Sequence, residues 1–247
     1  MDAVTPETET AIVDIWYTPI SIEQWDDIDA RYLDQLTPPE RERRDRFHFR
    51  KDRILYLTAK ALARLVIPRY ADAETPSETI RFEDHPGGKP FISGPAEAQK
   101  VQFNLSHTDG MVACVVSPDF EVGVDVEDIY RKSATDDIAQ RFFAAPEVAE
   151  YMKLPEKSRF LRFFQYWTLK EAYIKGRGLG LRIPLGDFSL SWDHDEISIH
   201  YHSEGPHTRE NWQFQQWEVG LGHMIAAAVR VDRPVTVKFL LHEVKLT

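Results

Sequence analysis

The spacing of apolar residues predicts that extended and helical segments alternate along the chain. Residues 11–17 are rich in β-branched and aromatic side chains and predict a strand. Residues 37–40 carry a hydroxyl followed by two prolines, which is typical of the start of a helix. Apolar positions then recur at helical spacing from Ile54 to Val66, and Pro68 marks the end of that stripe. We therefore expect a strand followed by helices in the first part of the chain.

Several short strands are expected next, divided by Gly, Pro and Asp residues that favour turns. They cover residues 80–82, 101–103, 111–117 and 122–126. Helical spacing returns over residues 136–175, and strands follow from residue 188 onward, among them 212–219, 223–231 and 235–241. This order predicts an α+β fold with two similar halves, residues 1–118 and 119–247. Residues 110–116 resemble residues 223–229, which agrees with a duplication.

Composition and charge narrow the classes of protein to consider. The 247 residues include 30 basic and 40 acidic side chains, a net charge of −10, and 43% are hydrophobic, which is typical of a globular protein. Such a charge disfavours nucleic acid and anionic membranes as partners. No apolar run approaches the roughly 18 residues of a membrane span. Cys114, the single cysteine, lies in an apolar run, so we expect a core residue and a cytoplasmic protein.

Two acidic residues alternate with valines in residues 122–127. A strand with this pattern places the valines on one face and both Asp125 and Glu127 on the other. Two neighbouring carboxylates are suited to binding one cation. Taken alone, however, the segment favours a half-buried strand with a polar outer face.

The helix expected over residues 158–175 adds a third carboxylate. Phe160, Phe164, Trp167 and Glu171 fall within one narrow stripe, so Glu171 extends a face expected to turn toward the core. A buried carboxylate needs a positive partner, either Lys175 one turn later or a metal ion. If Glu171 meets Asp125 and Glu127, the three oxygen ligands suit Mg²⁺ or Mn²⁺, and Mg²⁺ commonly binds substrate phosphates.

Groups that bind phosphate are present on expected loops. Ser106 and His107 precede a turn, and Lys89 follows a pair of glycines. Ser106 and His107 fit a turn bonded to its own backbone equally well, and Lys89 fits a solvated turn. The sequence has no P-loop, dinucleotide fingerprint, zinc-protease or serine-hydrolase motif.

Basic residues are concentrated in residues 41–53, which carry a net charge of +4. This segment fits a solvated helix with ion pairs such as Glu40–Arg44 and Glu42–Arg46. It also fits an anion-docking surface, in which Arg43 and Arg44 contact an acidic partner.

Three motifs in order resemble the 4′-phosphopantetheinyl transferases of the surfactin-synthetase-activating type. They are FNLSH at 103–107, GVDVE at 123–127, and WTLKEAYIK at 167–175 followed by GLGL at 178–181. The resemblance implies a pseudo-dimer of two α+β halves with coenzyme A and Mg²⁺ in the cleft between them. It implies transfer of 4′-phosphopantetheine from coenzyme A to a serine of an acyl or peptidyl carrier protein, with release of adenosine 3′,5′-bisphosphate. It also implies a monomer whose first half docks the carrier.

The resemblance also implies roles for individual residues. Asp125, Glu127 and Glu171 are expected to bind Mg²⁺, and Ser106, His107 and Lys175 are expected to hold phosphates. The residues expected near the nucleotide and its 3′-phosphate are Lys89, Arg81 and Arg53. Glu147, which follows a Phe-Phe pair, is the expected base for the carrier serine, with Glu127 as the alternative. Glu147 also fits a glutamate in the first turn of a helix, where it favours the helix dipole.

Two other classes of function remain open at this point. Carboxylates with Mg²⁺ also serve phosphohydrolases and nucleases, whose acceptor is water. A catalytically inactive module that binds carrier proteins could keep the same fold. The sequence leaves open whether the carrier belongs to fatty-acid, polyketide, peptide-synthetase or siderophore synthesis.

Overall fold

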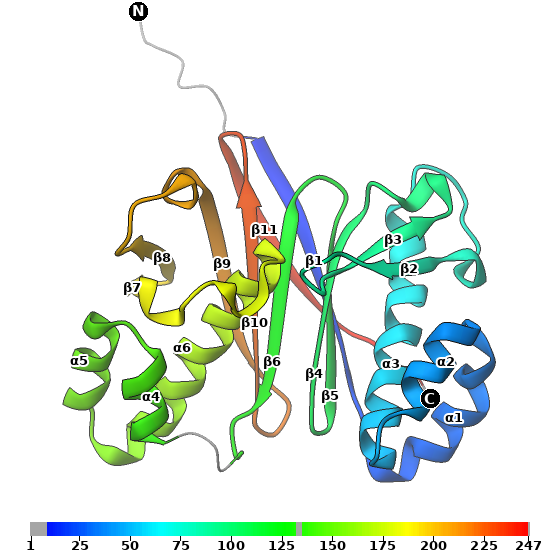
Figure 1. Ribbon diagram of the computed structural model, residues 1–247, viewed down its shortest axis with the longest axis horizontal. Coiled ribbons are helices and arrows are strands. Elements are labelled where there is room, and N and C mark those ends of the chain that lie inside the picture. Colours follow the sequence, from blue (N-terminus) through cyan, green and yellow to red (C-terminus); the bar gives the residue numbers. More distant parts are fainter. Residues whose placement is uncertain (1–8, 132–134, 247) are drawn as a thin grey trace, which may run out of the picture.

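Two halves with the same order of elements make up the chain in the computed structural model, which describes residues 9–131 and 135–246 (Figure 1). The first half contains β1 (Glu9–Pro19), α1 (Trp25–Tyr32), α2 (Pro38–Asp45), α3 (Arg50–Val66), β2 (Arg81–Asp84), β3 (Pro90–Gly94), β4 (Gln102–Thr108) and β5 (Met111–Ser117). The second contains β6 (Glu121–Asp128), α4 (Asp136–Phe142), α5 (Ala145–Lys153), α6 (Glu156–Arg177), β7 (Phe188–Asp193), β8 (Glu196–Tyr201), β9 (Asn211–Val219) and β10 (His223–Val231). The expected α+β fold with two similar halves is confirmed. Residues 1–8 of the expected first half lie outside the described residues.

The two halves build equivalent sheets. The strand order β1-β5-β4 in the first half corresponds to β6-β10-β9 in the second, and all of these neighbours are antiparallel. The last strand, β11 (Val235–Glu243), crosses over and pairs parallel with β1 of the first half. The chain therefore closes back on its own beginning, and the halves are not independent units.

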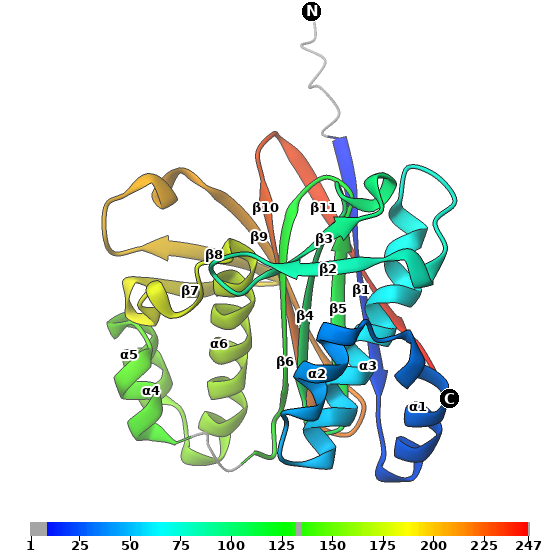
Figure 2. The same cartoon turned by 45° about the vertical axis from the view of Figure 1, so that its right-hand side comes forward.

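Helices cover the outer face of each sheet, and a third apolar layer lies between the sheets. α3 packs on the sheet of the first half and α6 on that of the second, at opposite sides of the molecule (Figures 1 and 2). Val122, Val124 and Val126 face the layer between the sheets, as their alternation predicted. Cys114 is a buried core residue, also as predicted. No helix in the described ranges is long and apolar enough to cross a membrane.

The similarity between residues 110–116 and 223–229 is shifted by one position relative to the structure. It aligns Met111 with Met224, yet Met111 faces the layer between the sheets and Met224 faces the core under α6. A shift of one residue reverses the face of every side chain on a strand. The duplication is present. Equivalent residues of the two halves are identified by the face of the strand that they occupy, and not by the similarity of the two sequences.

Side chains join the two sheets where β4 of the first half lies beside β6 of the second. Asn104 Oδ1, Ser106 Oγ and Thr108 Oγ1 accept hydrogen bonds from the backbone N–H groups of Val124, Val126 and Asp128, at 3.0, 3.3 and 3.4 Å. We call this contact the seam. The three side chains replace the carbonyl groups of an ordinary strand ladder, which leaves polar groups of both halves in direct contact.

Candidate functional site

A cavity of about 240 Å³ opens along the seam between the two halves. Its wall from the first half includes the β2–β3 turn and β4, and its wall from the second half is the end of α6. The lining residues are Gly87, Gly88, Lys89, Pro90, Asn104, Leu105, Glu171, Ile174, Lys175, Gly178 and Gly180. We call it the seam cavity. Residues of the FNLSH motif and of the WTLKEAYIK motif line it together. The third motif, GVDVE, lies on the neighbouring strand β6.

Ser106, Asp125 and Lys175 form a direct cluster beside this cavity. Ser106 Oγ donates to Asp125 Oδ1 at 2.9 Å and accepts from Lys175 Nζ at 2.8 Å. Lys175 Nζ also lies 2.6 Å from Asp125 Oδ1. Ser106 belongs to strand β4 and not to the loop that we expected, because its hydroxyl serves the seam. The hydroxyl has one donor and two acceptor sites, and all of them are used.

The second oxygen of Asp125 is in a different situation. Oδ2 is buried and has no hydrogen-bond partner among the described residues. Burial and the neighbouring carboxylate of Asp125 raise the pKa of Glu171 to about 7, against the effect of Lys175, and Glu127 adds to the rise. Burial and Asp125 also raise the pKa of Glu127. Asp125 thus destabilises the charges of both Glu127 and Glu171, which a cation would relieve.

The three carboxylates do not lie close enough together to form a complete metal site. In residues 9–131 and 135–246, no three His, Cys, Asp or Glu side chains converge closely enough to hold a metal ion. Glu127 instead accepts from Thr108 Oγ1 at 3.3 Å and pairs with Arg131 at 3.3 Å. The site therefore has the charge for a cation and an orphaned oxygen to receive one.

Two glycines allow α6 to lie against β6. A Cβ atom on Gly123 would lie only 2.0 Å from the carbonyl oxygen of Ala172 and 2.3 Å from the amide nitrogen of Gly176. A Cβ atom on Gly176 would lie 2.8 Å from the ring of Trp212. This close approach brings Lys175 within reach of Asp125. From the sequence we treated Gly123 only as part of the GVDVE motif and missed this role. A glycine inside an apolar strand is a signal that another backbone approaches closely.

Helix α6 is buried on more sides than its sequence stripe suggested. Glu171 was expected on the core-facing stripe, but it is only half-buried and lines the seam cavity. Lys170 is the charged residue of this helix that is completely buried. Both faces of the helix are covered, one by β6 and β10 and the other by α5 and β7, so a single stripe could not identify the inward face.

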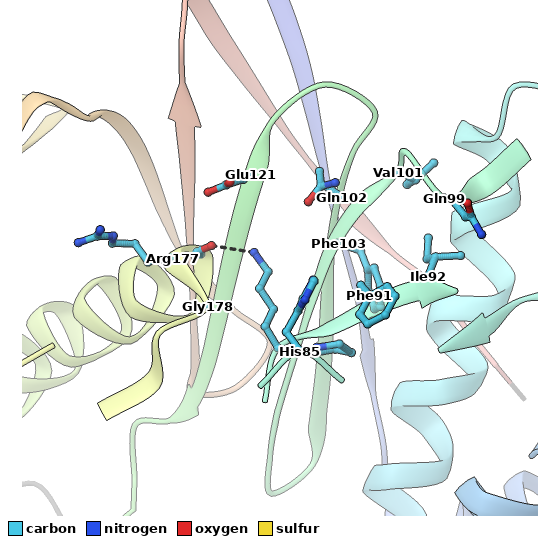
Figure 3. A pocket seen from close by; sticks show the side chains of 13 residues that line it. His85, Phe91, Ile92, Gln99, Val101, Gln102, Phe103, Glu121, Arg177 and Gly178 are labelled. Carbon is cyan, nitrogen blue, oxygen red and sulfur yellow. Dashed lines mark hydrogen bonds between the residues drawn. The ribbon is translucent and has the colours of Figure 1, made fainter. Parts of the chain in front are cut away.

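Lys89 connects the β2–β3 hairpin to the second half. Its Nζ donates to the backbone carbonyls of Val122 at 2.9 Å and Gly176 at 2.7 Å, and burial lowers its pKa to about 8. Its stem lines the seam cavity and also an adjoining cavity of about 430 Å³, where Glu121 lies on the β6 side and Arg177 on the α6 side (Figure 3). The ammonium expected near the nucleotide is therefore already engaged by protein carbonyls.

Two other expected phosphate ligands, His107 and Arg53, line neither cavity. His107 is exposed, and desolvation together with Lys175 lowers its pKa against the effects of Asp52 and Asp125. Arg53 donates weakly to the carbonyl of His48 at 3.4 Å, and its Nε is buried without a described partner.

Arg81 is the first residue of β2 and donates to the carbonyls of Glu78 and Ile80 just before the strand, and it lines neither cavity. The structure therefore does not bring Arg81 to the cluster.

Glu147 is held away from the seam. It is 1% exposed, pairs with Lys170 at 2.8 Å, and accepts hydrogen bonds from the backbone N–H groups of Ala144 and Leu190. It occupies the third position of α5, as the helix-terminus alternative expected. The structure does not bring this expected base to the carboxylate cluster.

Most of the basic segment is neutralised by acidic neighbours. Arg43 pairs with Asp84 at 2.7 Å, and the largely buried Arg44 pairs with Asp29 and Asp45. The expected pair of Glu42 and Arg46 is present, whereas Glu40 pairs with Lys60 and Arg64 and not with Arg44. The segment is better described as a network of ion pairs than as a free positive surface.

Comparison with known proteins shows similarity over both halves. Residues 121–230 match the family model of the 4′-phosphopantetheinyl transferase superfamily, and residues 23–119 match that of the 4′-phosphopantetheinyl transferase N-terminal domain. The chain is 29% identical over 215 residues to the 4′-phosphopantetheinyl transferase Sfp of Bacillus subtilis strain 168, which covers 86% of this chain and 91% of Sfp.

A second relative is the 4′-phosphopantetheinyl transferase psf-1 of Bacillus pumilus. It is 34% identical over 182 residues, which cover 71% of this chain and 74% of psf-1. A crystal structure of a holo-(acyl-carrier-protein) synthase from Bacillus anthracis in complex with CoA (3′,5′-ADP) aligns with 45% of this chain and 96% of its own, with 16% identity and a TM-score of 0.39.

Proposed function

Because this chain belongs to the 4′-phosphopantetheinyl transferase superfamily, we propose that its seam cavity catalyses transfer of 4′-phosphopantetheine from coenzyme A to a serine of an acyl or peptidyl carrier protein. The observation that carries the proposal is the cluster of Ser106, Asp125 and Lys175, which joins a hydroxyl of the first half to a carboxylate and an ammonium of the second. The other product is adenosine 3′,5′-bisphosphate.

We assign Mg²⁺, or Mn²⁺ in its place, to Asp125, Glu127 and Glu171. The buried and unpartnered Oδ2 of Asp125 supports this assignment, as do the raised pKa values of Glu127 and Glu171. Three carboxylates without a thiolate or a clustered imidazole are a donor set for a hard cation. The bound ion would supply positive charge for the pyrophosphate of coenzyme A.

Lys175, Ser106 and His107 would hold the phosphates. Lys175 lies at the wall of the seam cavity, where its ammonium would stabilise charge on the leaving bisphosphate, and Ser106 would fix its direction. His107 is exposed beside Ser106, where its ring would donate a hydrogen bond to a phosphate oxygen. Lys89 would shape the cavity, and Arg53, whose Nε is buried without a described partner, is our candidate for the 3′-phosphate in preference to Arg81.

We assign removal of the serine proton to Glu127. Its side chain is 14% exposed, so it reaches solvent at the end of the carboxylate cluster, and it would accept the proton through an oxygen that does not bind the ion. Glu147 is fully engaged in its buried pair, so it has no route to a carrier serine.

The carrier would dock where exposed apolar residues surround this end of the seam. Phe49, Tyr130 and Leu221 are 63%, 69% and 97% exposed. The loops that carry them are linked: Gly222 packs against Tyr130, His223 bonds to the carbonyl of Asp109, and Asp109 pairs with Lys51. A surface of this kind suits an apolar protein partner. It would draw on both halves of the chain and leave Arg43 and Arg44 outside it.

Both sides of the site come from one chain, so we propose a monomer that acts in the cytoplasm. The single buried cysteine supports a reducing compartment. Light scattering of the purified protein with and without coenzyme A tests the oligomeric state.

The decisive experiment is incubation with coenzyme A, Mg²⁺ and a panel of apo carrier proteins, followed by intact-mass measurement. We expect a carrier to gain one phosphopantetheine group. Breakdown of coenzyme A without modification of any carrier would favour a phosphohydrolase. Binding of carriers with neither change would favour an inactive binding module.

A further inference from the structure

A completely buried ion pair lies on the side of α6 away from the seam. Lys170 is 0% exposed, and its ammonium donates to the carbonyls of Leu185 at 2.7 Å and Phe188 at 2.6 Å and pairs with Glu147 at 2.8 Å. Glu147 in turn accepts from the N–H groups of Ala144 and Leu190. Every donor of the ammonium and both oxygens of the carboxylate are occupied. The pair thus ties the start of α5, the start of β7 and the middle of α6 to one point.

The first half contains the same construction. Glu40 is the third residue of α2, as Glu147 is of α5, and each accepts a hydrogen bond from the N–H group of the residue before its helix. Glu40 pairs with Lys60 on α3 at 3.4 Å, as Glu147 pairs with Lys170 on α6. The prolines before Glu40 and Glu147 are also shared. The buried pair is therefore a duplicated part of the fold, and in the first half Glu40 pairs with Arg64 at 2.6 Å in addition.

The two copies differ in the residues on the C-terminal side of the lysine. One and five residues after Lys170, α6 presents Glu171 and Lys175 to the seam cavity. The same steps from Lys60 on α3 lead to Ala61 and Leu65, which carry no charge. Only the second copy therefore anchors the helix that carries Glu171 and Lys175.

We propose that Glu147 and Lys170 are positioning residues that set the rotation and depth of α6, so that Glu171 and Lys175 face Asp125. Lys170 fixes the helix against β7 on one side, and Gly123 lets it lie directly on β6 on the other. A helix held between these contacts cannot rotate without losing hydrogen bonds of a buried charge. This inference rests on the proposed function, because that function assigns Glu171 to the metal ion and Lys175 to the phosphates.

The test compares the pair with its copy. Glu147→Gln and Lys170→Met alter the second half, and Glu40→Gln and Lys60→Met are the matched controls in the first. Each variant is measured for melting temperature, for Mn²⁺ affinity by calorimetry without coenzyme A, and for kcat and KM with the carrier protein. Glu147→Gln, Lys170→Met and Glu40→Gln should lower the melting temperature, because each leaves a buried charge uncompensated. Lys60→Met should lower it less, because Arg64 still pairs with Glu40 at 2.6 Å.

Only the second-half variants should lose about 10- to 100-fold in Mn²⁺ affinity, the range expected when a group that orients metal ligands is removed. Their kcat should fall in parallel while KM for the carrier stays unchanged. If a single variant does not fold, Glu147→Gln combined with Lys170→Met removes both charges together, and the same effects are expected of it.

Equal effects of both pairs on Mn²⁺ affinity and kcat would overturn the proposal, as would unchanged Mn²⁺ affinity in a folded second-half variant. Loss of the acidic limb of the pH profile in Glu147→Gln, with Mn²⁺ affinity intact, would overturn it too and make Glu147 a base. If the unaltered protein binds Mn²⁺ but modifies no carrier, the proposed function fails while the positioning of the metal ligands is still tested.

Discussion

Lys175 and Asp125 share only one of the two carboxylate oxygens. The ammonium of Lys175 lies 2.6 Å from Oδ1, while Oδ2 is buried and has no partner among the described residues. A buried carboxylate with a single cationic partner on one side is incompletely compensated. This asymmetry gives Asp125 two separable functions, one toward Lys175 and one toward a metal ion.

Substitution at each position separates these functions. Asp125→Asn should abolish transfer and Mn²⁺ binding, because the neutral amide keeps the shape but not the charge. Lys175→Met should lower kcat by about 10²–10³-fold, as expected for loss of one group that stabilises charge in the transition state, and keep Mn²⁺ binding. Steady-state kinetics and calorimetry measure both effects. Lys238→Met, at an exposed position on β11, is the control. Wild-type Mn²⁺ binding in Asp125→Asn would contradict the metal assignment.

The titration of Glu171 predicts how stability without metal depends on pH. Its pKa is raised from 4.5 to about 7, mainly by burial and by Asp125. A raised pKa in the folded state stabilises the protein below pH 4.5, and this contribution is lost as pH rises to about 7. The loss amounts to roughly 3 kcal/mol at most.

Glu171→Gln should therefore be more stable than the unaltered protein at pH 8 without metal, and the difference should shrink toward pH 5. Addition of Mg²⁺ should stabilise the unaltered protein and have little effect on the variant. Thermal melts at both pH values, with and without Mg²⁺, measure this. The control is Glu218→Gln, at an exposed position of β9. A variant less stable than the unaltered protein at pH 8 would show that Glu171 is compensated in some other way.

The seam predicts a stability effect for Ser106. Ser106→Ala leaves the N–H group of Val126 without its acceptor, and it removes one donor from Asp125 and one acceptor from Lys175. An unsatisfied buried group costs about 1–3 kcal/mol, so the free energy of unfolding should fall by that amount. Denaturant titration measures the fall, with the exposed Thr236→Ala as the control. Unchanged stability would mean that the sheets do not depend on the seam.

The spacing of apolar residues identified most helices and strands, because most of them either have one face toward solvent or consist of a uniform apolar run. Strands β5 and β10 were predicted with the bounds that the structure gives, Met111–Ser117 and His223–Val231. Strand β4 was cut short at residue 103, because the polar side chains of Asn104 and Ser106 look like a loop. Their polarity serves the partner half, and a contact between distant segments leaves no local pattern. Strand β3 was missed for a related reason, since it begins at Pro90 and pairs only with β2.

The same limit applies to the site. The motifs located Asp125, Glu171 and Lys175, because alternation and helical spacing determine which face each residue occupies. They could not distinguish a glutamate in the cavity from one in the core. Glu147 became a candidate base from its position after two phenylalanines, and only its contacts with Lys170 and two backbone N–H groups reveal a buried pair. The sequence did carry one unused signal, the shared Pro-Glu of residues 39–40 and 146–147.

The exposed apolar residues near the seam predict a selective effect on the carrier protein. Leu221→Glu should raise KM for the carrier and leave KM for coenzyme A unchanged, because Leu221 is 97% exposed and lies outside both cavities. A charge placed in an apolar contact costs its desolvation. Ile12→Glu, at another exposed apolar position, is the matched control on β1. An equal rise in both variants would show that the carrier docks elsewhere.

The closest contact between α6 and β6 predicts the consequence of adding one methyl group. A Cβ atom on Gly123 would meet backbone atoms of Ala172 and Gly176 at 2.0 and 2.3 Å, and a backbone cannot turn aside as a flexible side chain can. Gly123→Ala must therefore push the helix outward, and the shift separates Lys175 from Asp125. Overpacking of this kind typically costs about 1–3 kcal/mol, so the variant should fold with a lowered melting temperature and a larger loss of kcat and Mn²⁺ affinity than its stability alone explains. Gly186→Ala is the matched control, because its Cβ would meet no atom within 4 Å. Thermal melts, calorimetry with Mn²⁺ and kinetics on the two variants measure the difference. If Gly123→Ala retained full Mn²⁺ affinity and kcat in a folded protein, the close approach of α6 would not be what aligns the site.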